Sequence, residues 1–301
     1  MKKILSVLVL TFFLTQNAIA QVGIGTNTPA ATAQLDVTSN QRGFLVPRMT
    51  SAERNAIVSP ANGLQIYNTT TGCLNYFNIN AWYEVCGNII TGLYPVGAVF
   101  CNGTPTLVVD VTNPTTGKTW MDRNLGATQV ATSSTDAASY GDLYQWGRGN
   151  DGHQCRTSVT TNTVSTIDQP GNALFILQPN QIPYDWRSPE NNNLWQGQFG
   201  VNNPCPSGYR LPTEVEFNNE RLSWSSNNTI GAFGSVLKLT KAGYRVWFGN
   251  ILETGNNGIY YSSTISTIDP GMSKCLDFGT STASLYDGWR VLGRSVRCIK
   301  N

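Results

Sequence analysis

The segment from Tyr184 to Trp195 holds the side chains best suited to binding a ligand. Its carboxylates and amides are hard oxygen ligands of the kind that Ca²⁺ prefers, and they also hydrogen-bond sugar hydroxyls. An indole beside them offers a flat apolar face on which a sugar ring can stack. The candidate ligand-binding residues are Asp185, Trp186, Glu190, Asn191, Asn193 and Trp195. The alternative is an ordered loop whose asparagine side chains satisfy its own backbone, in which case the segment binds nothing.

The sequence does not offer a recognisable set of catalytic residues. His153 is the only histidine, so a hydrolytic triad would depend on it, and no serine, cysteine or carboxylate can be assigned to it. No pair of carboxylates stands at identifiable positions for glycan hydrolysis. We therefore expect a protein that is not an enzyme, needs no cofactor other than the possible Ca²⁺, and uses His153 structurally.

Seven cysteines are present, and no two are spaced as CxxC. With a single histidine in the chain, a structural zinc site of the usual Cys/His kind is not expected. Cys73 and Cys86 bracket a predicted hairpin over residues 74–85, with its turn near residues 78–80. Facing strand positions bring Cβ atoms within bonding range, so we expect a Cys73–Cys86 disulfide.

Residues 1–20 have the pattern of a signal peptide. Lys2 and Lys3 precede an apolar run over residues 4–14, and Ala18-Ile19-Ala20 supplies the small residues for cleavage before Gln21. The run is too short to span a bilayer, which needs about 20 residues. We expect a secreted or cell-surface protein in which disulfides are stable and in which no membrane span remains after cleavage.

Net charge excludes some partners. Removal of Lys2 and Lys3 takes the basic residues from 20 to 18, equal to the 18 acidic residues. A neutral chain lacks the electrostatic attraction that nucleic acid or anionic lipid requires. Asn, Thr, Ser and Gly take the place of charged residues, which suits a β-rich extracellular protein.

The first predicted domain, residues 21–90, reads as short strands separated by Asn/Thr/Gly turns. Thr50 and Glu53 form a capping box that starts a helix over residues 51–57. So few large apolar side chains give a marginal core, and the segment would gain stability by packing against copies of itself. A trimeric or otherwise oligomeric stalk and an independent small β module remain alternatives.

The second predicted domain, residues 91–301, carries seven of the eight tryptophans and has enough length for a proper core. Thr213 and Glu216 form a second capping box, which predicts a helix from Glu214 to about Trp224. Residues 293–300 alternate apolar and polar positions and predict one strand. The expected core residues are Trp120, Trp146, Tyr209 and Leu211.

Residues 22–87 resemble the stalk or collar segments of surface and tail-fibre-like proteins from Bacteroidota. The resemblance lies in "GIGT", "GFLVPRMT" and "GLQIYNTTTGCL". The resemblance implies a homo-oligomer, such as a trimer, formed through this module.

Residues 117–300 resemble the Fibrobacter succinogenes major paralogous domain. The matching blocks occur in order: "WMDRNLGA", "YGDLYQWGR", "DGHQ", "NNLWQG", "NPCPSGYRLPT" and "SVRCIK". The resemblance implies a compact, loop-rich α+β domain of the C-type-lectin-like superfamily, preceded by the mostly-β module. This fold hosts sugar binders, protein binders, ice binders and an oxidase, so it names no ligand.

The resemblance also bears on the remaining cysteines. Lectin-like folds tie the last strand to an earlier element, which implies a Cys205–Cys298 disulfide. Cys101, Cys155 and Cys275 stay unassigned, with at most one further bridge among them. Cys275 and Cys298 are the only late cysteines, and they do not match the paired active-site cysteines of a formylglycine-generating oxidase.

Two functions are therefore expected as alternatives. The first is an exported adhesion or recognition protein, whose lectin-like head binds glycan or protein on an oligomeric stalk. The second is a structural subunit of an extracellular fibre or surface assembly, in which the C-terminal domain serves only for packing.

Overall fold

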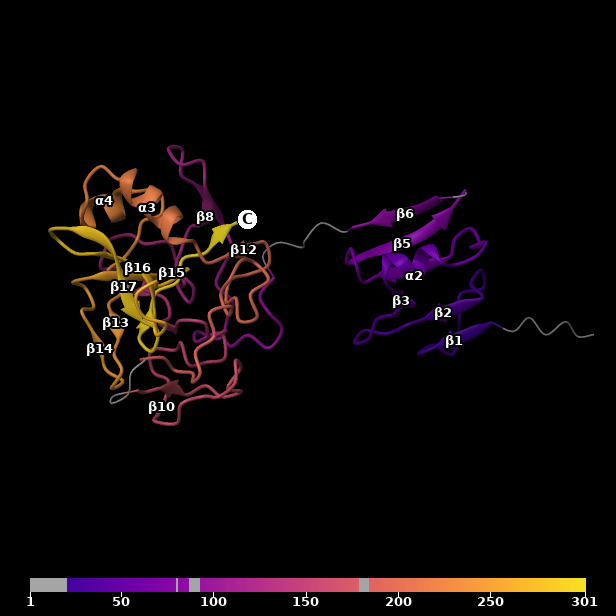
Figure 1. The fold of residues 1–301 in the computed structure, drawn as a ribbon, viewed down its shortest axis with the longest axis horizontal. Coiled ribbons are helices and arrows are strands. Elements are labelled where there is room, and N and C mark those ends of the chain that lie inside the picture. Colours follow the sequence, from indigo (N-terminus) through magenta and orange to yellow (C-terminus); the bar gives the residue numbers. More distant parts are fainter. Residues whose placement is uncertain (1–20, 80, 87–92, 179–183) are drawn as a thin grey trace, which may run out of the picture. The chain divides into compact units, whose positions relative to one another are not determined.

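The computed structural model describes residues 21–79, 81–86, 93–178 and 184–301 (Figure 1). The chain divides into two compact units, Met1–Asn88 and Ile89–Asn301. The predicted signal peptide, residues 1–20, lies outside the described residues. Across the described ranges, no helix combines the length and the apolar character needed to cross a membrane.

The N-terminal unit contains two small sheets. One is a parallel pair of β1 (Val22–Ile24) and β2 (Leu35–Val37). The other has four strands in the order β3-β4-β5-β6. Its strands are β3 (Arg48–Met49), β4 (Gln65–Asn68), β5 (Cys73–Asn78) and β6 (Ala81–Val85).

Helix α2 (Ser51–Asn55) is the only helix among the described residues of this unit. The Thr50 side chain accepts a hydrogen bond from the Glu53 backbone N–H, and the Glu53 carboxylate accepts one from the Thr50 N–H. This is the capping box that the sequence predicts, and it satisfies two backbone groups at the helix start. The helix ends two residues earlier than predicted.

The predicted hairpin is formed by β5 and β6, which pair antiparallel from Leu74↔Val85 to Asn78↔Ala81. Asn80, in the predicted turn, lies outside the described residues. Cys73 and Cys86 flank the Leu74↔Val85 pair, and the structure joins them in a disulfide with a Cα–Cα distance of 4.7 Å. The cross-link closes the open end of the hairpin.

The C-terminal unit is built from several short sheets around three longer strands. These strands, β15 (Gly258–Ile265), β16 (Met272–Phe278) and β17 (Ala283–Trp289), form an antiparallel meander. A second sheet has the order β12-β19-β8-β7, and a third has the order β14-β13-β18-β9. The second contains β7 (Asp110–Thr112), β8 (Thr119–Met121), β12 (Tyr209–Arg210) and β19 (Ile299–Lys300). The third contains β9 (Tyr144–Gln145), β13 (Tyr244–Arg245), β14 (Ile251–Leu252) and β18 (Gly293–Arg294).

The remaining elements are short. Strands β10 (Thr160–Thr161) and β11 (Phe175–Ile176) form a parallel pair. The helical segments are η1 (Ala137–Ser139), α3 (Glu214–Leu222) and α4 (Thr229–Gly234). Helix α3 begins at the Thr213/Glu216 capping box, as predicted, and Figure 1 shows it with α4 at one end of the unit.

The expected fold class, α+β, is wrong. Among the described residues the α-helices have only five, nine and six residues. The rest of the regular structure in both units consists mainly of strands in several small sheets. Gly, Asn, Ser and Thr dominate most of the chain, and these residues favour turns and caps over helix interiors. Capping boxes followed by good helix formers, at residues 51–55 and 214–222, give helices of only five and nine residues. The structure is therefore a β-rich fold.

Residues 293–300 also differ from the single strand that alternation predicts. They split into β18 and β19, which belong to different sheets. Between them Arg297 is buried and donates to the Asn124 side chain and to the carbonyls of Met121 and Leu237. A charged side chain that must turn inward interrupts the alternation that a continuous strand requires.

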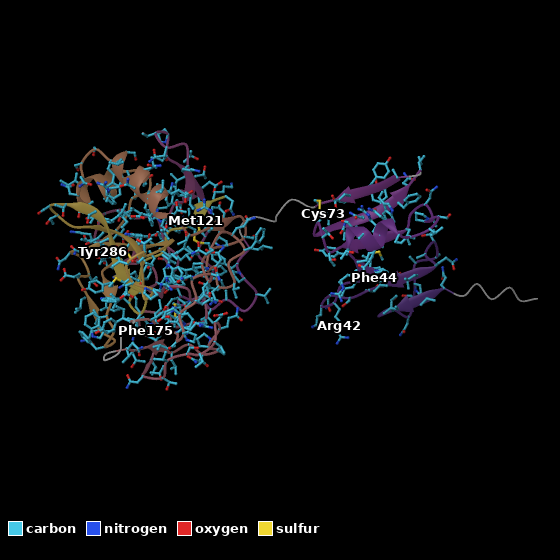
Figure 2. The ribbon with its side chains drawn as sticks, viewed as in Figure 1. Arg42, Phe44, Cys73, Met121, Phe175 and Tyr286 are labelled. Carbon is cyan, nitrogen blue, oxygen red and sulfur yellow. A yellow bond between two sulfur atoms is a disulfide. The ribbon has the colours of Figure 1, made fainter. Side chains whose placement is uncertain are left out.

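The C-terminal unit has a proper apolar core. The four expected core residues, Trp120, Trp146, Tyr209 and Leu211, are all buried. Figure 2 marks Met121, Phe175 and Tyr286 in this unit, and Met121 lies in the same buried cluster as Trp146. The expected Cys205–Cys298 disulfide is present, a third joins Cys101 to Cys155, and Cys275 is free and buried.

Candidate functional site

The parallel sheet of the N-terminal unit presents four apolar side chains on one face. Val22 pairs with Leu35 and Ile24 with Val37, and residues two apart on a strand share a face. All four are between 40% and 55% exposed. Parallel sheets are found almost only with both faces covered. A two-stranded parallel sheet with this face open is therefore incomplete in a single chain. We call the four residues the β1–β2 face.

The four-stranded sheet has a second apolar face. The pairing places five large side chains on the side away from α2, and we call them the open sheet face. Tyr76 and Tyr83 stack there, with ring centroids 5.3 Å apart. Tyr67, Tyr83 and Val85 are exposed and the other two are half-buried. The open sheet face consists of Tyr67, Leu74, Tyr76, Tyr83 and Val85.

The opposite side of this sheet, which faces α2, holds a network of polar groups beside a small apolar group. Arg54 donates to the Asn75 side chain at 2.6 Å, and Asn68 donates to the same oxygen at 3.0 Å. Ser51 exchanges hydrogen bonds with Asn68. Hydrogen bonds from Thr71 and Asn75 hold the pKa of Glu84 below its usual value. The covered side therefore combines this polar network with the apolar side chains of Ile66, Phe77 and Trp82, whereas the uncovered side is apolar.

Burial shows how little core one chain supplies. Ile66 and Cys73 are the only buried apolar side chains among the described residues of 21–86. Eleven large apolar side chains of the same range are exposed, among them Phe44, which Figure 2 marks in this unit. Monomeric domains rarely expose contiguous apolar patches of this kind, which mark interfaces. This unit has the surface of a subunit.

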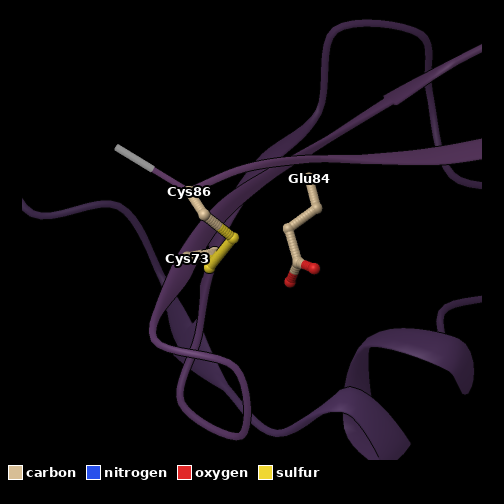
Figure 3. Close-up of side chains that lie close together, drawn as sticks. All are labelled: Cys73, Glu84 and Cys86. Carbon is tan, nitrogen blue, oxygen red and sulfur yellow. A yellow bond between two sulfur atoms is a disulfide. The ribbon is translucent and has the colours of Figure 1, made fainter. Parts of the chain in front are cut away.

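One group in this unit has the composition of a metal site. Cys73, Glu84 and Cys86 lie close together (Figure 3) and form the only such group among the residues described. The two sulfurs are bonded to each other. A cysteine binds a metal ion as the thiolate, so this group does not suit a metal ion while the disulfide is intact.

The structure places three of the six candidate ligand-binding residues in the core. Asp185, Trp186 and Trp195 are buried, so neither indole presents a face to solvent. Trp186 donates to the Trp146 carbonyl at 2.6 Å, and Trp195 donates to the carbonyl of Arg148 at 3.1 Å. The expectation of an exposed stacking platform at these two tryptophans is therefore wrong.

Among the polar candidates of the same segment, Asn191 makes its hydrogen bonds within the protein. Asn191 donates to Asp168 at 3.0 Å and accepts from the Asn193 backbone N–H at 2.9 Å. Burial raises the pKa of Asp185 to about 7, and the Arg290 guanidinium, 3.6 Å away, opposes this. Glu190 is half-buried and Asn193 is exposed. This arrangement is that of an ordered loop, the alternative raised by its sequence.

His153 lies in the core with both ring nitrogens occupied. Nε2 accepts a hydrogen bond from the Gln145 backbone N–H at 3.0 Å, and Nδ1 lies 2.5 Å from the Asp151 carboxylate. Since Nε2 accepts, Nδ1 carries the proton and donates it to Asp151. Burial, followed by the nearby Arg148, lowers the pKa of His153 to about 4, although Asp151 opposes this. His153 is therefore neutral at pH 7.

A pH-dependent stability follows from this histidine. Its folded pKa of about 4 lies below its unfolded value of 6.5, so its contribution is complete above pH 6.5 and is lost as pH falls toward 4. We expect His153→Asn to be less stable than wild type at pH 7, and the difference to shrink by at most about 1.4 kcal/mol per pH unit below 6.5. Denaturant unfolding of both proteins at pH 7, 5.5 and 4.5 measures it. Aspartates that do not contact His153 cancel in the difference, and Asp151, whose pKa of about 2 depends on His153, titrates below the pH range measured. A difference that is constant with pH would contradict this assignment.

The two apolar faces are the functional feature that sequence reasoning did not locate. For the β1–β2 face the sequence does carry a signal, in "VGI" and "LDV", where apolar residues alternate with Gly23 and Asp36. Only the pairing of the strands shows that all four apolar side chains share one face.

Comparison with known proteins agrees with this location. A family model described as "Phage tail like trimerisation region" matches residues 23–97, a quarter of the chain that covers the whole described part of the N-terminal unit from Gly23 onward. No curated protein and no solved structure matches the chain. The N-terminal module is thus similar to a phage tail-like trimerisation region, which fits the stalk-like character expected of it.

Proposed function

We propose that this protein is a structural subunit of a trimeric, fibre-like extracellular assembly. Three N-terminal modules associate through the β1–β2 face and the open sheet face, and each chain carries its C-terminal unit as a head. The observation that carries the proposal is the excess of exposed apolar side chains in the N-terminal unit, whose buried side holds only Ile66 and Cys73 beside the Asn68–Asn75 network among the described residues. The family match supports three as the number of copies.

The energy of association comes from burying these faces. Full burial of a valine, leucine or isoleucine side chain is worth about 1.5–3 kcal/mol, and each face residue here is already partly covered. Several such side chains per chain, each repeated in three copies, suffice for a stable interface. Fixing three chains costs translational freedom, which the apolar gain must exceed.

The proposal includes export and the nature of the head. The signal-peptide pattern of residues 1–20 supports export to the cell surface or beyond. The ordered blocks between residues 117 and 300 support a head like the Fibrobacter succinogenes major paralogous domain. Its role in this proposal is to decorate the assembly without catalysing a reaction.

Deletion of residues 21–88 tests whether the N-terminal unit alone forms the trimer while the C-terminal unit folds independently. Because the described apolar clusters all lie beyond residue 93, the truncated protein is expected to fold and melt cooperatively. It should be a monomer, whereas the chain that retains residues 21–88 should be a trimer under the same conditions. Light scattering and thermal unfolding of both proteins measure this. A truncated protein that is still trimeric would show that the assembly surface lies in the C-terminal unit, contrary to the proposal.

A further inference from the structure

A cavity of about 300 Å³ lies in the C-terminal unit beside the Cys101–Cys155 disulfide. Its walls come from four stretches of chain that are tied to one another. Asn102 donates to the Gly126 carbonyl at 2.9 Å, the Thr128 N–H to the Ala138 carbonyl at 3.1 Å, and Arg156 Nε to the Gly141 carbonyl at 2.8 Å. These bonds and the disulfide fix the cavity before any ligand arrives, which lowers the cost of binding.

Asp142 lines this cavity and is only 5% exposed. Within the described part of the chain, no N–H or O–H group donates to its carboxyl oxygens. The carboxyl lies against Gly126, where any Cβ would overlap it, and Gly126 has a φ of +81° that favours glycine. Burial raises the pKa of Asp142 to about 7. The carboxyl faces the cavity, so its hydrogen bonds are completed from outside the chain, by water or by a ligand hydroxyl that displaces it.

Arg156 supplies the opposite charge in the same cavity. Its Nε and Nη2 donate to the carbonyls of Gly141 and Ala242, and its guanidinium lies 5.4 Å from the centre of the Tyr140 ring. Among the described residues its Nη1 makes no hydrogen bond. Arg156 and Asp142 do not form an ion pair, although Arg156 stabilises the Asp142 carboxylate at longer range. A fixed acceptor and a fixed donor thus line the cavity without meeting.

We propose that this cavity binds a neutral polyhydroxylated ligand of the size of a single sugar ring, through hydroxyl groups that donate to Asp142 and accept from Arg156. Above pH 7, where Asp142 is charged, a cation would be repelled by Arg156 and an anion by Asp142, whereas a hydroxyl group both donates and accepts. The cavity lies at the lower end of the range for small-molecule sites, so it suits one ring and not an extended chain. This site is separate from the trimer surface and from the segment 184–195.

The test uses the full mature protein and a panel of neutral methyl hexopyranosides, followed by saturation-transfer NMR and titration calorimetry. At least one glycoside is expected to bind at millimolar concentration. Asp142→Asn should weaken that binding at least tenfold, since the amide presents one acceptor oxygen in place of two. Ala138→Phe is expected to abolish it, because Ala138 is an exposed lining residue where a large side chain would obstruct the entrance. Thermal unfolding of both variants checks that the fold is kept.

Glu190→Gln is the matched control, since Glu190 lies in the segment 184–195 and not in this cavity. It should leave binding unchanged, and a loss there with none in Asp142→Asn would move the site to that segment. Absence of binding up to 50 mM across the panel, about the weakest that calorimetry resolves, would overturn the proposal. So would binding of ethylammonium or inorganic phosphate in place of glycosides. The trimer mass does not enter this experiment, so its failure leaves the assembly proposal standing.

Discussion

Replacing Ile24 and Val37 together by aspartate is expected to convert the trimer into monomers. Both side chains belong to the β1–β2 face and point from neighbouring strands to the same side. In the trimer another copy would cover each new carboxylate and bury it without a partner. This burial costs several kcal/mol of association free energy, and the cost recurs in all three chains. We expect the association to weaken at least a hundredfold, about 2.7 kcal/mol or more. Sedimentation velocity over a range of concentrations measures it.

Val58→Asp is the matched control for this change. Val58 is 89% exposed and belongs to neither apolar face, so the same substitution should leave the trimer intact. Melting of the C-terminal unit should be the same in all three proteins, because its core is separate. A double variant that still sediments as a trimer would show that the β1–β2 face is not in the interface.

Trp195→Ala is expected to destabilise the C-terminal unit by about 3–5 kcal/mol, the usual cost of removing a buried tryptophan. Its ring lies 5.5 Å from that of Trp146 and 5.9 Å from that of Tyr261, between centroids. Its indole N–H is shared by the carbonyls of Arg148 and Asn202, which would lose a donor. Denaturant unfolding measures the loss.

Phe199→Ala provides the comparison, because Phe199 follows four residues later and is 83% exposed. Its removal should change the stability by no more than about 0.5 kcal/mol. If Trp195→Ala changed the stability as little as Phe199→Ala, the indole would not be part of the core. The segment 184–195 would then again be a candidate ligand-binding surface.

Features set by neighbours in the chain could be predicted from the sequence. The capping boxes at Thr50 and Thr213 depend on residues three positions apart, and both helices begin where expected. The Cys73–Cys86 hairpin is local in the same sense. The α+β class rests on the resemblance of residues 117–300, and strand periodicity could not correct it, because apart from β15, β16 and β17 the strands of the C-terminal unit are two or three residues long.

The candidate site depended on contacts between distant segments, which the sequence does not reveal. Trp186 and Trp195 look like a binding platform beside Asp185, and only the carbonyls of Trp146 and Arg148, some 40 to 50 residues earlier, show them to be core. Likewise Asp142 stands within "YGDLYQWGR" as an ordinary motif residue. Its cavity appears only when Gly126 and Arg156 are brought to it by the fold.

The central claim is that three copies assemble through the N-terminal module, and the mass of the mature protein in solution tests it most directly. Light scattering coupled to size exclusion should give three times the mass of one chain, unchanged on dilution through the micromolar range. A mass of one chain at these concentrations would contradict the account, because the β1–β2 face and the open sheet face would then be exposed to water with nothing to cover them.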